Sequence, residues 1–172
     1  DRLLTPAAGA DDFYPYHQHA PELLPNGHLL LYDNGNHRAV PPTAAKPRPW
    51  YSRAVEYRID EDAMTAEKVW EYSGVHNGRR YFAGALGDAD YLPQTGNVLI
   101  NHGSLNDVDS AVYNQGQFSA HIIEVTRSAS PEEVFRLMIS DQDGGQGDGW
   151  RVYRAERVPS LYSDAVATAI SP

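Results

Sequence analysis

The sequence predicts an all-β fold of about two four-stranded antiparallel β-propeller blades. Three observations predict it: an internal repeat, apolar–polar alternation with a period of two residues, and turn residues between the alternating runs. Four-stranded units that recur along a chain are typical of propeller blades. The alternative is a β-sandwich built from two similar meanders.

The repeat joins the two halves of the chain. The run "LLPNGHLLL" at Leu23–Leu31 is similar to "YLPQTGNVLI" at Tyr91–Ile100, and their prolines lie 68 positions apart. At the same offset, "RAVEYR" from Arg53 aligns with "HIIEVT" from His121. We therefore expect one segment over 1–172, with blade-like units over 17–75 and 81–140 and a closing strand over 150–158. The strands expected in the first unit are His19–Leu24, Leu29–Tyr32, Ala54–Ile59 and Lys68–Tyr72.

The individual elements follow from local patterns. Asn26-Gly27 is a strong hairpin signal, and the Pro-rich run 41–49 cannot lie inside a strand. In the run 53–60, Val55, Tyr57 and Ile59 share one face, so the opposite face with Glu56 and Arg58 is expected to be solvated. Asn101-His102-Gly103 is interpreted as a turn.

Composition narrows the function. The 172 residues suffice for a real core, and a net charge of −9 without runs of like charge argues against nucleic-acid and anionic-membrane binding. No apolar run is long enough to span a bilayer.

Two blades do not close a propeller ring, for which about 4 to 8 blades are typical. We therefore expect contact with the remaining blades, from missing chain or another copy, including a possible homo-oligomer.

The most unusual short motif is His17-Gln18-His19, directly before an expected hairpin. On a strand, the two imidazoles would point to the same side and could converge on a metal ion. Further ligands would have to come from Glu22, Asp33, His37 or His102, and none has a diagnostic spacing. At the 68-residue offset, His17 and His19 correspond to Ala85 and Gly87, so the imidazoles are specific to one unit. This favours a local chemical role over packing.

Several blocks in order resemble one known family. "QHAPELLPNGHLLLYDNGNHR" and "YSRAVEYRIDEDAMTAEKVWEY", preceded by "RLLTP", are similar to the C-terminal part of the bacterial aryl sulfotransferases that use no nucleotide sulfate donor. The resemblance covers about 2–70 well and 81–153 loosely. It implies a six-bladed propeller of which this chain is the C-terminal part. It also implies a periplasmic or secreted location.

The resemblance also implies a reaction. A sulfuryl group passes from a phenolic sulfate ester to a phenol through a sulfohistidine, with ping-pong kinetics and without a cofactor. The Gln-His motif makes His19 the expected catalytic nucleophile, with other site residues supplied by earlier blades. Tyr81, Phe82 and Trp150 are candidates to stack on a phenol ring, or else pack between blades. Two alternatives stay open: a metal-binding propeller that uses His17 and His19, and a non-catalytic scaffold that binds partners.

Overall fold

The computed structural model describes residues 4–7, 12–38, 50–106, 118–141 and 149–159. Within these ranges every regular element is a strand, so the all-β prediction is confirmed for them. The strands are β1 (Thr5–Pro6), β2 (Gln18–Leu23), β3 (Leu29–Asp33), β4 (Arg53–Asp60), β5 (Thr65–Tyr72), β6 (Val75–His76), β7 (Arg79–Arg80), β8 (Asp88–Leu92), β9 (Asn97–Asn106), β10 (Phe118–Val125) and β11 (Glu133–Ile139). Among the described residues, no helix is long and apolar enough to cross a membrane.

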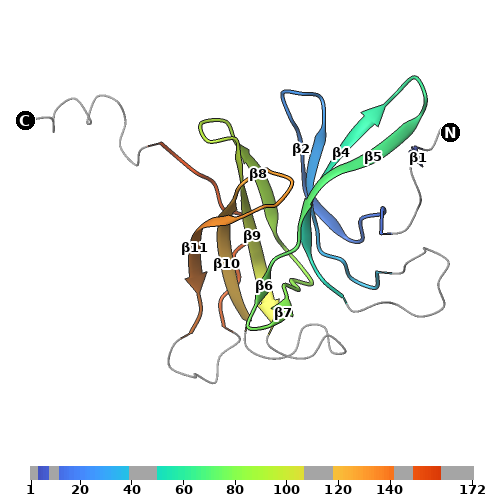
Figure 1. The fold of residues 1–172 in the computed structure, drawn as a ribbon. Helices are drawn as coiled ribbons and strands as arrows, with labels where there is room; N and C mark the ends of the chain where they lie inside the picture. The colour runs from blue at the N-terminus through green and yellow to red at the C-terminus, as the bar shows by residue number, and fades with distance from the viewer. Residues whose placement is uncertain (1–3, 8–11, 39–49, 107–117, 142–148, 160–172) are drawn as a thin grey trace, which may run out of the picture.

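The strands form two main sheets and one small hairpin (Figure 1). The first sheet has the order β1-β5-β4-β3-β2, the second has the order β11-β10-β9-β8, and β6 pairs with β7. All neighbours in the two main sheets are antiparallel except β1, which the sequence did not predict and which runs parallel to β5. Each sheet thus contains one four-stranded meander, and no closed sheet is found in the described part of the chain.

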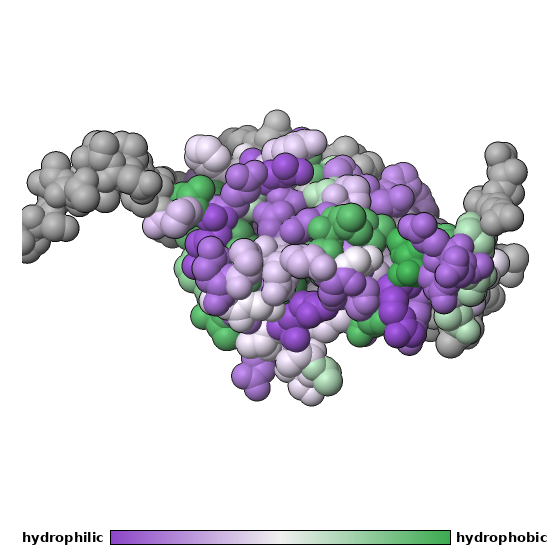
Figure 2. Space-filling model, turned by 90° about the horizontal axis from the view of Figure 1, so that it is seen from above, coloured by the Kyte–Doolittle hydropathy of each residue, from purple (hydrophilic) through white to green (hydrophobic). Residues whose placement is uncertain are grey.

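The two sheets pack face to face through a shared core. From the first sheet it includes Leu30, Tyr32 and Ala54, and from the second it includes Ile100 and Ile123, all of them fully buried. The turns of β2–β3 and β8–β9 both lie at the top in Figure 1, so the opposite ends of these strands also lie together. Seen from the turn side, the surface is largely hydrophilic with separate hydrophobic patches (Figure 2).

Strand β4 is buried on both faces, which corrects the expectation of a solvated face. Glu56 is fully buried, because the second sheet covers this side of the strand. Its carboxylate accepts hydrogen bonds from His28 Nδ1 at 2.6 Å and from Arg127 Nε at 2.5 Å. Arg127 follows β10, so this ion pair joins the two sheets. Of Glu56 and Arg58, Arg58 alone is exposed as expected.

The interpretation of Asn101-His102-Gly103 as a turn is wrong, because β9 continues through these residues to Asn106. Strand β10 pairs with them, with Ile122 opposite Asn101 and His121 opposite His102. Local turn chemistry is overridden here by a long partner strand, as tertiary contacts often override local preference.

The closing strand expected over 150–158 is not part of either sheet. Two backbone hydrogen bonds hold the segment instead, from Trp150 N to Phe118 O and from Val152 N to Gly103 O. Gly103 permits this approach, since a Cβ there would lie 2.0 Å from the Val152 carbonyl oxygen. The segment therefore attaches to β9 and β10 of the second sheet through single backbone hydrogen bonds.

Candidate functional site

Four segments far apart in the sequence meet at the end of β3 that lies away from the hairpin turn. They are 16–19, 34–38, 50–52 and 81–86. Ser52 Oγ donates to Asn34 O at 2.8 Å, and Ser52 N donates to Tyr81 O at 2.7 Å. Asn36 Nδ2 donates to Gly84 O at 2.7 Å. His19 lies in this junction at the start of β2, so the expected nucleophile is surrounded by loop segments that adjoin the two sheets.

The Asn34 side chain is the centre of the junction. Its Nδ2 lies 2.6 Å from Ala83 O and 2.7 Å from Leu86 O. Both partners are carbonyl acceptors, so the nitrogen of the amide must face them, and this fixes the orientation of the side chain. The amide oxygen then faces His19, with Oδ1 2.6 Å from Nδ1.

This arrangement determines the tautomer of the His19 ring. The two atoms near Nδ1 are Asn34 Oδ1 and, at 3.2 Å, the His17 carbonyl oxygen, and both are acceptors. Nδ1 therefore carries the proton and donates it. In the neutral imidazole the lone pair is then on Nε2, which is the nucleophilic nitrogen.

Glycines let the backbone segments approach this closely. Gly35 has φ +78°, and a Cβ there would lie 1.9 Å from Tyr51 O. Gly87 has φ +114°, and a Cβ there would lie 2.4 Å from a ring carbon of Tyr32. Both conformations are ones that L side chains rarely adopt.

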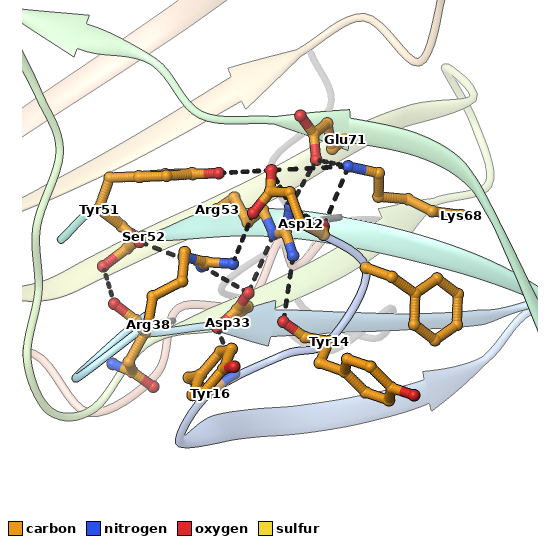
Figure 3. Close-up of polar contacts among 12 residues, drawn as sticks. Asp12, Tyr14, Tyr16, Asp33, Arg38, Tyr51, Ser52, Arg53, Lys68 and Glu71 are labelled. Carbon is orange, nitrogen blue, oxygen red and sulfur yellow. Dashed lines mark hydrogen bonds and ion pairs between the residues drawn. The ribbon is translucent and has the colours of Figure 1, made fainter. Parts of the chain in front are cut away.

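A buried network of charged side chains lies next to the segment that precedes β2 (Figure 3). Asp33 lies at the end of β3, and its Oδ2 accepts hydrogen bonds from Arg38 Nη2 at 2.7 Å and from Arg53 Nε at 2.9 Å. Arg53 also reaches Asp12 and Glu71, at 3.0 and 2.8 Å. All three groups Asp33, Arg38 and Arg53 are fully buried, so each charge requires these partners.

The same network holds the segment that leads to His19. Burial alone would raise the pKa of Asp12, but the Tyr51 hydroxyl, Arg53 and Arg38 together hold it below its usual value. Tyr16 N donates to Asp33 Oδ1 at 2.8 Å, and Gly35 N donates to Tyr16 O at 2.9 Å. The backbone entering β2 is thereby fixed three residues before His19.

A β-bulge changes which residue of the second sheet is equivalent to His19. His19 pairs with Tyr32 and Glu22 pairs with Leu30, so β2 has one more residue than β3 between these pairs. The second copy of the repeat has one more residue in its turn, so Tyr32 corresponds to Asn101, which pairs with Asp88. The equivalent of His19 in the second sheet is therefore Asp88, a buried carboxylate. The assignment of Gly87 as the equivalent residue, made from the sequence offset, is wrong.

The expected aromatic residues lie in three different environments. Phe82 is half-buried at the junction, with its ring 5.6 Å from Trp50. Tyr81 is buried in the core and stacks on His102 with ring centroids 4.1 Å apart. Trp150 is 58% exposed and attaches to the second sheet. Of the three rings, the structure thus brings only that of Phe82 beside the segments that hold His19.

Sequence reasoning did not single out Asn34 or Trp50, and it considered His37 only as a metal ligand. The run Asp33-Asn34-Gly35 carried a signal, since an Asn followed by a Gly after a strand indicates a specific backbone shape. Nothing local identified Trp50, which meets Phe82 only through the fold.

The premise of the metal site is wrong. His17 has φ +56° and precedes β2, so it does not alternate with His19 as in a strand. The ring of His17 lies near His37, with centroids 6.3 Å apart, whereas His19 is held by Asn34. No group of three or more His, Asp or Glu in the described ranges could hold a metal ion.

Comparison with known proteins matches this chain to one family. The sequence model of the family "Arylsulfotransferase (ASST)" matches residues 1–151. The chain is 32% identical over 100 residues to the arylsulfate sulfotransferase AssT of Escherichia coli O6:H1, which covers 58% of the chain and 16% of that protein. It is also 32% identical over 93 residues to AssT of Lelliottia amnigena, covering 54% of the chain and 15% of the relative. The chain thus matches only a small part of these relatives, and it belongs to the arylsulfotransferase family.

Proposed function

We propose that the protein transfers a sulfuryl group from a phenolic sulfate ester to a phenol, with His19 Nε2 as the nucleophile. The observation that carries the proposal is the fixed Nδ1–H of His19, held by Asn34 Oδ1 at 2.6 Å. Family membership and the printed names of the relatives support aryl sulfate chemistry.

Because the proton is on Nδ1, Nε2 can attack in the first step without a proton having to leave the ring. The Nε2 lone pair attacks sulfur, the bond from sulfur to the aryl oxygen breaks, and the phenolate leaves with the bonding electrons. The ring keeps its Nδ1 proton and becomes an N-sulfonated imidazolium. Asn34 Oδ1 accepts a hydrogen bond from this now cationic ring, and such a charge-assisted bond is stronger than a neutral one.

The second step reverses the first with a different phenol. The acceptor oxygen attacks sulfur, the bond from Nε2 to sulfur breaks, and the electron pair returns to the imidazole. The proton of the acceptor phenol passes to solvent. Two half-reactions through a covalent intermediate predict ping-pong kinetics.

The two face-packed meanders serve as consecutive blades of a larger propeller in this proposal. Strand β11 supports it, because it is an edge strand with exposed apolar side chains, namely Val134, Phe135, Leu137 and Met138. Exposed edges and apolar faces are typical of surfaces that another sheet covers. Remaining blades, from the same chain or another copy, would cover this surface and supply the cationic groups that neutralise the sulfuryl oxygens. We retain the periplasmic or secreted location as part of the proposal.

The test compares His19→Asn with His28→Asn in the full-length gene product. Asn matches the size of His approximately but lacks a nucleophilic nitrogen, so His19→Asn is expected to abolish transfer from phenyl sulfate. His28→Asn removes an imidazole at the β2–β3 turn and is expected to retain transfer. Mass spectrometry after donor alone should find the added sulfuryl group on the peptide with His19. Transfer by His19→Asn at the parent rate would contradict the proposal and favour a different nucleophile.

A further inference from the structure

Three aromatic rings that are open to solvent to different degrees contact one another in sequence beside the junction. His37, Trp50 and Phe82, called here the aromatic platform, are linked by ring centroid distances of 4.5 Å and 5.6 Å, with Trp50 in the middle. His37 is exposed, and Trp50 and Phe82 are half-buried. Large aromatic rings that stay partly open to solvent at a junction of loops are typical of binding surfaces.

The platform is tied to His19 through short hydrogen-bonded steps. Phe82 precedes Ala83, whose carbonyl accepts from the same Asn34 amide that holds His19. Trp50 lies two residues before Ser52, whose hydroxyl donates to the Asn34 carbonyl at 2.8 Å. Because both anchors meet at Asn34, the platform and His19 are parts of one fixed arrangement.

The guanidinium of Arg80, next to Tyr51, has no acidic partner in the described ranges. Arg80 lies 4.4 Å from the ring centroid of Tyr51, the residue after Trp50, and no ion pair joins Arg80 to a described carboxylate. Burial alternates from Arg80 to Ala83: Arg80 is exposed, Tyr81 buried, Phe82 half-buried and Ala83 buried. Arg80 and Phe82 therefore lie on the same side of this extended segment.

We propose that the aromatic platform and Arg80 bind the ring of an anionic aryl compound, which in this protein is the aryl sulfate donor. A planar ring packs on Trp50 and Phe82, and the guanidinium favours a ligand that carries a negative charge. This specificity site rests on the sulfuryl-transfer function proposed above. It takes aryl sulfates in preference to alkyl sulfates, because only the former present a ring.

The test measures binding separately from chemistry, by calorimetric titration of phenyl sulfate into the full-length gene product carrying His19→Asn. Trp50→Ala is expected to raise Kd about three- to tenfold, as is typical of one lost aromatic contact. Phe82→Ala should have a similar effect, and Arg80→Gln should weaken phenyl sulfate but leave phenol unchanged. Trp150→Ala is the matched control, since Trp150 is held by its backbone at Phe118 of the second sheet and its side chain is exposed, and its Kd should equal that of the parent.

The outcomes separate this inference from the proposed function. Unchanged phenyl sulfate binding in both Trp50→Ala and Phe82→Ala would overturn the platform, as would equal affinity of the parent for phenyl sulfate and methyl sulfate. Trp50→Phe serves where Trp50→Ala fails to fold, and it should recover most of the affinity. Binding that follows these expectations, together with full transfer activity of His19→Asn, would support the platform and reject the nucleophile.

Discussion

A buried histidine couples the stability of the fold to pH. His102 is fully buried on β9, its Nδ1 lies 2.7 Å from Tyr32 Oη, and its Nε2 has no hydrogen-bond partner in the described ranges. Burial, together with the charges of His121 and Arg136, which act in the same direction, lowers the pKa of His102 to about 3. The fold therefore holds this imidazole neutral.

The sign and size of the effect follow from linkage. The unfolded chain binds a proton at this residue with a pKa near 6.5, whereas the folded chain binds it only near 3. Between these values the unfolded state holds more protons, so stability is complete above about pH 6.5 and falls as the pH falls. One group contributes a slope of about 1.4 kcal/mol per pH unit, which amounts to about 2 kcal/mol between pH 8 and pH 5.

The assay is urea unfolding of the 172-residue chain at pH 8, 6.5 and 5, with parent and His102→Gln compared at each pH. Gln offers an acceptor to Tyr32 but does not titrate, so its loss of stability toward pH 5 should be smaller by about 2 kcal/mol. His102→Phe serves as a second non-titrating variant that keeps the stack on Tyr81. His17→Gln, which removes an exposed imidazole, should show the pH dependence of the parent. Identical pH dependence in the parent and both His102 variants would refute the reasoning.

Three further predictions concern a buried ion pair, a close backbone approach and the residue that holds His19. Glu56→Gln should lower the free energy of unfolding by about 2 to 3 kcal/mol, because Arg127 and His28 lose a buried carboxylate. Its control is Glu67→Gln, which removes the exposed ion pair with Arg58 and should cost under about 0.5 kcal/mol. Gly87→Ala should lower the free energy of unfolding by about 2 to 3 kcal/mol, because the new Cβ clashes with Tyr32 and φ is positive. Gly27→Ala, where φ is positive but the space is open, should lower it by about 1 kcal/mol. Chemical denaturation that ranks the two variants in the reverse order would contradict this. Asn34→Ala should reduce the transfer rate more than tenfold, since Asn34 Oδ1 holds His19 Nδ1; an unchanged rate would remove Asn34 from the mechanism.

Local patterns predicted the strands well, because their causes are local. The expected runs in the first unit agree with β2 to β5 within a few residues, since alternation along the backbone and the Asn26-Gly27 turn act over short distances. The same local reasoning was wrong at Glu56 and at His102. Both residues are buried because the two sheets pack together, and that contact depends on residues about seventy positions away.

The sequence by itself determined the all-β class, the two similar meanders and the Gln-His motif that places His19 at the start of a strand. Only the tertiary structure decided what surrounds that histidine. The Asn34 amide that fixes its tautomer is oriented by the carbonyls of Ala83 and Leu86. The ring of Trp50 contacts that of Phe82, 32 positions later in the chain. These contacts join segments that no local pattern relates, because hydrogen-bond direction and ring packing depend on distances in space that chain spacing does not encode.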